Sequence, residues 1–174
     1  MALRSRLHFD LWCVTKRVEG RFEFEDVLDE YWEYLRFARE AHEHKFIIET
    51  ASILEKDAAD KITLRGLINE TRATEYFDQE DKDKIDEQLG IHTRVRKSII
   101  LLRHKLIAHR DSRWTYKEAW KRAEITVDQL DALTSTCLAV TNDILRAHSF
   151  AVRERYVAPV EEFERLLRAL RPAT

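Results

Sequence analysis

The chain contains very few residues that interrupt helices. Among its 174 residues there are three glycines and two prolines. Sheet-rich proteins need turn residues about every ten positions, so this scarcity favours long helices joined by short connections. A chain of this length is also long enough to bury a substantial core as one domain. We therefore expect residues 1–174 to form a single all-α domain, an antiparallel helical bundle with additional flanking helices.

Cysteines and long apolar segments are equally scarce. The two cysteines, Cys13 and Cys137, provide no disulfide framework and suit a reducing compartment, where we expect both to be small core residues. The first residues lack an apolar segment of signal-peptide length, and no run of about 18 apolar residues occurs anywhere. The sequence therefore predicts a cytoplasmic protein with no membrane partner.

The formal net charge of −2 conceals an uneven distribution. Residues 92–122 carry ten lysines and arginines against two acids, whereas residues 19–60 carry thirteen acids against five bases. The basic segment is consistent with a surface that binds a polyanion. The same asymmetry is expected if two oppositely charged helices pack within one bundle or between two subunits. The charge pattern alone leaves both interpretations open.

The apolar periodicity and the helix signals divide the chain into successive helices. Two capping boxes, Thr115 with Glu118 and Thr126 with Gln129, predict helices that start near residues 116 and 127. Gly90 costs about 1 kcal/mol relative to alanine inside a helix, so we expect a bend or break there. The predicted helices cover approximately residues 3–18, 25–60, 64–77, 80–109, 116 onward, 127–150 and 160–170.

The residues at the end of the predicted helix 80–109 carry the clearest chemical signal. Residues 103–111 read Arg-His-Lys-Leu-Ile-Ala-His-Arg-Asp. RNA cleavage without a metal requires a general base, a general acid and a fixed cation beside the phosphate. Arg103, His104 and His109 are the right residue types for these tasks. In a purely structural interpretation the histidine caps or fills the core, and the arginine lies over apolar neighbours.

A helical wheel separates these three side chains. Arg103 and His109 differ by about 120° on an ideal helix, and His104 points further away. Either the helix loosens at its end, or a second copy of the chain completes the site. His109 extends an apolar stripe formed by Ile91, Val95, Ile99, Leu102 and Leu106.

Bases and aromatic residues surround the motif and suggest contacts with RNA. Trp114, in a predicted loop, is suited to stacking on an unstacked base. Tyr116 and Trp120 lie one helical turn apart, a spacing that favours a core position over base stacking. The candidate RNA-binding residues are Arg96, Lys105, Arg110, Arg113 and Trp114.

No cofactor or metal site is predicted. His42 and His44 lie about 200° apart on a helix, and Glu40 with His44 forms only a pair. Together with Glu49 they do not provide the spacing of metal ligands. The sequence also lacks a glycine-rich phosphate loop and a nucleophilic Ser or Cys placed beside a base.

The stretch Leu-Leu-Arg-His-Lys-Leu-Ile-Ala-His-Arg-Asp, residues 101–111, resembles the signature of HEPN domains, and its ending is most similar to their abortive-infection branch. The resemblance implies a helical bundle, a homodimer whose two motifs line one cleft, and metal-independent endoribonuclease activity. In such enzymes the 2′-oxygen attacks its own phosphate and leaves a 2′,3′-cyclic phosphate and a 5′-hydroxyl. Arg103 would stabilise the phosphorane and His109 would act as general acid or base. His104 would support His109 or supply the second proton transfer.

The resemblance also suggests a biological setting, and it leaves two alternatives to ribonuclease activity. HEPN proteins occur in antiviral defence and toxin–antitoxin systems, so an antitoxin or another defence protein is a possible partner. Asp111 stands where toxins paired with a nucleotidyltransferase often have tyrosine. The first alternative is a non-catalytic HEPN module that binds RNA or a partner protein through the basic face. The second is a structural dimerisation bundle in which the motif is a helix cap.

Overall fold

The computed structural model of the chain describes residues 1–16, 23–55, 63–72, 74, 77–108 and 115–171. Within these ranges every regular element is a helix and no strand occurs, which confirms the all-α prediction. The helices are α1 (Ala2–Thr15), α2 (Glu25–Glu30), α3 (Trp32–Leu54), α4 (Leu64–Arg72), α5 (Gln79–Gly90), α6 (Thr93–Leu102), the π-helix η1 (Arg103–Ala108), α7 (Tyr116–Ala123), α8 (Val127–Ala147) and α9 (Ala158–Ala169).

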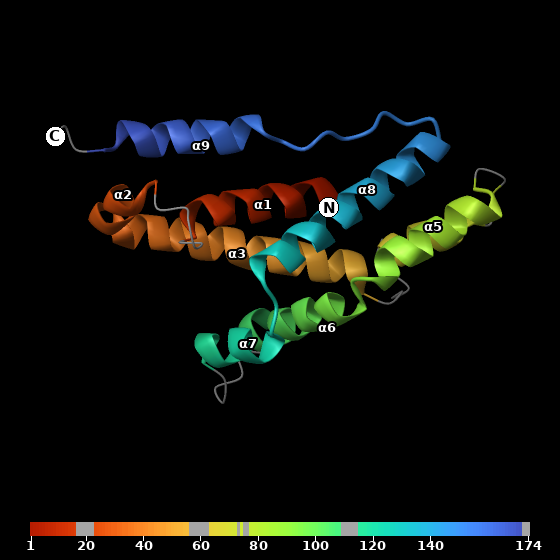
Figure 1. The fold of residues 1–174 in the computed structure, drawn as a ribbon, viewed down its shortest axis with the longest axis horizontal. Helices are drawn as coiled ribbons and strands as arrows, with labels where there is room; N and C mark the ends of the chain where they lie inside the picture. Colours follow the sequence, from red (N-terminus) through yellow and green to blue (C-terminus); the bar gives the residue numbers. More distant parts are fainter. Residues whose placement is uncertain (17–22, 56–62, 73, 75–76, 109–114, 172–174) are drawn as a thin grey trace.

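The bundle is built around α1 and α3, which lie side by side in opposite directions (Figure 1). Helix α9 lies along α1, on the side away from α3, and α8 crosses α1 obliquely. Helix α6 and η1 pack against α3 on the opposite side of the bundle from α9, with α7 beside them. The segment that carries the motif is therefore docked on α3.

Aromatic side chains of α1 and α3 form the centre of the main core. Phe9, Trp12 and Phe46 are almost completely buried. The rings of Phe9 and Phe46 meet edge to face with centroids 5.6 Å apart, a favourable arrangement for aromatic pairs. Cys13 and Cys137 are buried in the same core, as predicted, and burial raises the pKa of the Cys137 thiol to about 12. Cys137 is thus a packing residue with an unreactive thiol.

A second, smaller apolar cluster attaches α9 to α2. Leu167 of α9 is fully buried, and the Phe24 ring lies beneath the guanidinium groups of Arg168 and Arg171, 5.6 and 5.7 Å from its centroid. Arg168 Nε also donates to Glu23 Oε1 at 2.9 Å. The buried members of this cluster are Phe24, Val27, Leu28, Leu35 and Leu167.

A charge network around the buried residues Arg6 and Asp10 fastens the connection between α8 and α9 to α1. Arg6 is 2% exposed and donates to Asp131 Oδ1 and Ser135 Oγ, each at 2.6 Å, and also to Asp10. Arg155 donates to both carboxylate oxygens of Asp10, at 2.8 and 2.5 Å. A buried cation is costly unless it is paired and hydrogen-bonded, and Arg6 meets both conditions.

The predicted helix starts and the predicted break are confirmed. Thr115 and Thr126 each accept from the backbone of the third helical residue, whose side chain bonds back to the cap. Helix α5 ends at Gly90 and α6 begins at Thr93, so the predicted helix 80–109 is interrupted. The break removes Ile91 from the apolar stripe: it is 74% exposed, and its predicted place in the stripe is wrong.

The predicted helix 25–60 is also divided. Tyr31 separates α2 from α3, and α3 ends at Leu54. The last residues of that prediction, 56–60, lie outside the described residues. The rest of the stripe on α6 is confirmed, because Val95, Ile99 and Leu102 are buried.

Candidate functional site

The motif begins where α6 changes into a π-helix. Residues Arg103–Ala108 form the wider helix η1, whose backbone bonds join residues five apart rather than four. Short π-helical segments of this kind are frequent at functional sites. The helix thus loosens at the motif, which is one of the two alternatives that the helical wheel left open.

Arg103 is held by two neighbours. Its Nη2 atom donates to Glu55 Oε1 at 2.5 Å and lies 3.0 Å from His104 Nε2. A guanidinium has no acceptor, so His104 Nε2 accepts this bond and carries no proton in it. The long side chain of Arg103 thereby reaches His104, although the two side chains point in different directions on an ideal helical wheel. Arg103 and His104 are brought together, and the guanidinium has a fixed orientation.

The other predicted site residues fall into two groups. Arg96 and Lys105 are half-buried, Arg96 on α6 and Lys105 within η1. Arg96 lies seven residues before Arg103 and lines a pocket rather than the surface beside the motif. The placement of the remaining residues stays a prediction because they lie outside the described residues: His109, Arg110, Arg113 and Trp114.

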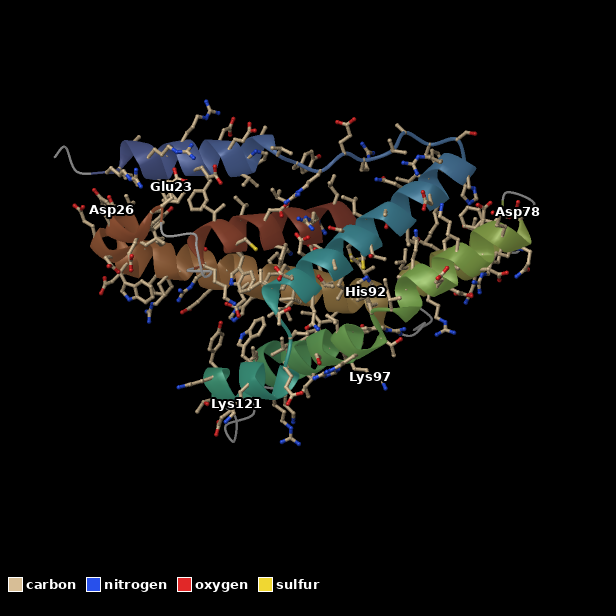
Figure 2. All side chains as sticks on the ribbon, viewed as in Figure 1. Glu23, Asp26, Asp78, His92, Lys97 and Lys121 are labelled. Atoms are coloured by element: carbon tan, nitrogen blue, oxygen red, sulfur yellow. The ribbon has the colours of Figure 1, made fainter. Side chains whose placement is uncertain are left out.

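The ion pair of Arg103 connects the basic and acidic parts of the chain. Glu55 directly follows the last residue of α3, and the side chains of Arg103 and Glu55 are 13% and 22% exposed. Packing of oppositely charged helices within one bundle therefore accounts for part of the charge asymmetry. Other cations remain at the surface: Lys97 on α6 and Lys121 on α7 lie along one edge of the molecule (Figure 2), and both are exposed. We refer to this edge, marked by Lys97 and Lys121, as the basic edge.

A buried carboxylate fixes the helix that follows the motif. Glu43 is 1% exposed and accepts from Trp12 Nε1 at 3.2 Å, Trp120 Nε1 at 2.8 Å and the Tyr116 hydroxyl at 2.6 Å. Burial and the bond to Glu43 raise the pKa of the Tyr116 hydroxyl, which therefore remains a donor. One side chain of α3 thus ties together α1, α3 and the first turns of α7.

A cation completes this cluster. The Trp12 and Trp120 rings are stacked with centroids 6.0 Å apart, and Lys16 Nζ lies 4.1 Å from the Trp12 centroid and 5.3 Å from that of Trp120. Burial lowers the pKa of Lys16, while the charge of Glu43 acts in the opposite direction. The core role predicted for Trp120 is confirmed. Tyr116 is more exposed than predicted, at 53%, yet its hydroxyl reaches the buried carboxylate.

His42 and Glu49, two of the residues considered as metal ligands, have other partners. The Nδ1 atoms of His8 and His42 lie 2.9 Å apart, and burial lowers the pKa of both imidazoles. Glu49 pairs with Arg4 at 3.2 Å and with Lys45 at 3.4 Å. Among the residues that the structure describes, no group of three or more His, Cys, Asp or Glu is arranged to hold a metal ion.

Sequence reasoning did not single out Glu55 or Glu43. Glu43 lies three and four residues before the buried Phe46 and Ile47, so its place on the apolar face of α3 was a usable signal. Nothing in the sequence distinguishes Glu55 from the other acids of residues 19–60, because its role depends on the tertiary contact between α3 and η1.

The chain is thus an all-α bundle that carries Arg103 and His104 at the start of η1. The sequence model of the HEPN_AbiU2 family, described as AbiU2, matches residues 2–169. The chain belongs to this family of abortive-infection HEPN domains. Comparisons with curated proteins and with solved structures gave no match. In the part of the chain that the structure describes, no helix is both long and apolar enough to cross a membrane.

Proposed function

We propose that the protein is a metal-independent endoribonuclease that cleaves single-stranded or looped RNA in prokaryotic antiviral defence. Membership of an abortive-infection family supports the setting. The observation that carries the proposal is the fixed guanidinium of Arg103, held between Glu55 and His104 in a π-helical turn. A cation with a preset orientation stabilises developing negative charge without having to reorganise during the reaction.

The proposed reaction is an internal transfer at phosphorus. The 2′-hydroxyl oxygen of one nucleotide attacks the adjacent phosphorus, and the bond from phosphorus to the 5′-oxygen of the next nucleotide breaks. A general base removes the 2′-hydroxyl proton, and a general acid protonates the leaving 5′-oxygen. The products are a 2′,3′-cyclic phosphate and a 5′-hydroxyl, with no water or metal consumed.

We assign a different role to each residue of the motif. Arg103 binds the non-bridging phosphate oxygens, which take the place of Glu55 at the guanidinium. His109 transfers a proton as general acid or base. His104 orients Arg103 through the bond to its Nε2 atom or, once the phosphate has displaced this bond, supplies the second proton transfer.

RNA would reach the motif along the basic edge. Exposed lysines on α6 and α7 attract phosphates and set the approach of the strand without reading its sequence. Residues of the segment 109–114 would add further contacts, including stacking by Trp114. A salt-dependent affinity for RNA is therefore part of the proposal.

The active form would be a homodimer in the cytoplasm. Two copies that place their motifs in one cleft would bring Arg103 and His109 side chains together even though a wheel separates them within one chain. An antitoxin or another defence protein bound over this cleft would hold the activity in check.

A non-catalytic module that binds RNA or a partner protein is the second candidate. The Arg103–Glu55 pair favours it, because the cation of the motif is already neutralised by a carboxylate. In this case the motif would stabilise the contact between α3 and η1, and the basic edge alone would bind the ligand.

Cleavage in EDTA separates the two candidates. Wild-type and His109→Ala proteins are incubated with mixed RNA, and the fragment ends are analysed. We expect wild-type protein alone to yield 2′,3′-cyclic phosphate ends. Intact RNA that is nevertheless bound would identify the non-catalytic module, and equal cleavage by both proteins would exclude His109 from the reaction.

A further inference from the structure

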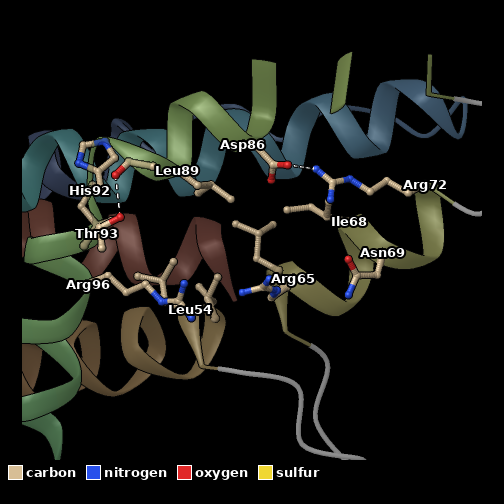
Figure 3. A pocket seen from close by; sticks show the side chains of 14 residues that line it. Leu54, Arg65, Ile68, Asn69, Arg72, Asp86, Leu89, His92, Thr93 and Arg96 are labelled. Atoms are coloured by element: carbon tan, nitrogen blue, oxygen red, sulfur yellow. Dashed lines mark hydrogen bonds and ion pairs between the residues drawn. The ribbon is translucent and has the colours of Figure 1, made fainter. Parts of the chain in front are cut away.

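A pocket of about 230 Å³ lies at the junction of α3, α4, α5, α6 and α8 (Figure 3). It is distinct from the motif, since neither Arg103 nor His104 lines it. Its apolar walls come from all of these helices except α6 and consist of Ile53, Leu54, Leu64, Ile68, Leu89 and Leu133. An apolar pocket that also contains a few charged groups is the usual form of a small-molecule site.

The charged groups of this pocket are mostly guanidinium groups. Arg65 of α4 and Arg96 of α6 extend toward the same end of the pocket from opposite sides (Figure 3). Within the described part of the chain, no side-chain hydrogen bond or ion pair is formed by either of them. The pocket therefore holds two cations whose charge no neighbouring carboxylate in the described structure neutralises.

Arg72 contributes a further unused donor. Its Nη2 atom is paired with Asp86, the single acid among the lining residues, and also donates to the Lys82 carbonyl at 3.3 Å. Its Nε atom is buried and has no hydrogen-bond partner among the described residues. A buried donor without a partner costs free energy that a bound acceptor would recover. His92, by contrast, already uses Nε2 in a bond to Thr136 Oγ1 at 2.9 Å.

We infer that this pocket binds a small organic anion, a phosphate or carboxylate group attached to an apolar body. Guanidinium groups match both anions in shape and charge, and the two unpaired arginines converge at one end. The leucine and isoleucine walls accept the apolar body. The pocket is smaller than sites of about 300–1,000 Å³ that enclose drug-sized molecules, so the body is one ring or a short chain.

The inference does not depend on ribonuclease activity. It rests on the contacts of Arg65, Arg72 and Arg96, and its test measures binding of a small molecule without RNA. A protein that fails to cleave RNA can still have this site, and a nuclease can lack it.

Phenyl phosphate is a suitable probe because it joins a phosphate to one aromatic ring. Isothermal titration calorimetry of the full chain compares it with inorganic phosphate and with benzyl alcohol, which each supply one half of the probe. We expect phenyl phosphate to bind at millimolar concentration or below, about tenfold more tightly than either half. Inorganic phosphate that binds equally well would overturn the apolar part of the inference, and absence of phenyl phosphate binding would overturn all of it.

Paired substitutions locate the binding. Arg65→Gln with Arg96→Gln removes two charges from the pocket, and Arg153→Gln with Arg165→Gln removes two from exposed positions outside it. We expect the first pair to weaken phenyl phosphate binding about tenfold or more and the second pair to leave it unchanged. Equal effects of both pairs would contradict the site.

Two further readouts keep the test decisive. Circular dichroism verifies the fold of each variant, and Arg65→Gln alone, at an exposed position of α4, replaces the first pair if that pair unfolds. If the arginine substitutions weaken RNA binding while phenyl phosphate does not bind, the two arginines contact an RNA backbone and the inference is wrong.

Discussion

Glu55 Oε1 lies 2.5 Å from Arg103 Nη2, so a carboxylate at the end of α3 forms an ion pair with the guanidinium of the motif. Both side chains are largely shielded from solvent, and a pair of this kind is screened less than one at the surface. In the proposed reaction an RNA phosphate has to replace this carboxylate. The ion pair therefore orients Arg103 and also competes with the substrate.

Glu55→Gln is expected to strengthen RNA binding and increase cleavage. The neutral amide keeps an acceptor for Arg103 but removes the competing negative charge. We expect RNA affinity and cleavage rate to rise about threefold or more, while the free energy of unfolding falls by about 1 kcal/mol. Fluorescence anisotropy with a labelled RNA and urea unfolding measure the two effects.

Glu124→Gln is the matched control for this substitution. Glu124 Oε2 accepts from Arg94 Nη2 at 2.6 Å, so the change also removes an acid paired with an α6 arginine, here at an exposed position. It should leave cleavage close to wild type. If Glu55→Gln only destabilises the protein, Glu55 is a structural partner of Arg103 and does not compete with RNA.

Removal of the Glu43 carboxylate should strongly destabilise the fold. Glu43→Ala leaves the indole groups of Trp12 and Trp120 without their acceptor in a largely buried place. We expect a loss of about 3–5 kcal/mol in the free energy of unfolding. Tyr116→Phe removes one donor at a more exposed position and should cost about 1–2 kcal/mol. Urea unfolding of the two variants gives both values, and equal losses would contradict the central position of Glu43.

The fold should lose stability as the pH falls below 6.5, the pKa of a histidine side chain in an unfolded chain. Burial lowers the pKa of His8 and His42 from 6.5 in the folded protein, an effect that Lys45 and Arg4 reinforce at His8 and Glu49 opposes. As the pH falls below 6.5, the two histidines of the unfolded chain bind protons before those of the folded protein do. The free energy of unfolding therefore decreases with falling pH. Well above pH 6.5, where both histidines are deprotonated in the folded and the unfolded protein, these two groups should cause no pH dependence.

The double variant His8→Gln with His42→Gln tests whether these two histidines cause the pH dependence of stability. Urea unfolding at about pH 7.5 and about pH 5.5 should show a smaller loss in the variant than in the wild type. Part of the loss should remain, because burial also lowers the pKa of His92. An unchanged loss would mean that other groups cause the pH dependence.

Much of the fold followed from local signals. The capping residues Thr115 and Thr126 marked the starts of α7 and α8, and Gly90 marked the break before α6. The division between α2 and α3 at Tyr31 was not predicted, since the sequence around it has no glycine or proline to signal an interruption. Val27 and Leu28 of α2 share an apolar cluster with Leu167 of α9, a contact that is distant in sequence and that local signals do not reveal.

The motif was predictable from sequence, but its surroundings were not. Arg103 and His104 were identified by residue type, spacing and family resemblance. Their contact required the π-helical turn and the length of the arginine side chain, neither of which an ideal wheel represents. Glu55 meets Arg103 across 48 positions of sequence, so only the packing of η1 against α3 reveals it.

Mixing two inactive variants tests the shared cleft of the proposed homodimer. If Arg103 of one copy acts with His109 of the other, coexpressed Arg103→Ala and His109→Ala chains form mixed dimers with one intact site. We expect cleavage on the order of a quarter of the wild-type rate, with neither variant active alone. Absence of rescue in dimers that are shown to be mixed would place both residues of a site in one chain.

The most direct test of the account is the cleavage rate of a defined RNA in EDTA by Arg103→Ala compared with Arg94→Ala. Both variants remove one arginine from the α6–η1 segment, and Arg94 forms an exposed ion pair away from the motif. We predict a loss of about a hundredfold or more for Arg103→Ala, with helicity retained, and a rate near wild type for Arg94→Ala. Equal rates for the two folded variants would contradict the claim that Arg103 stabilises the transition state.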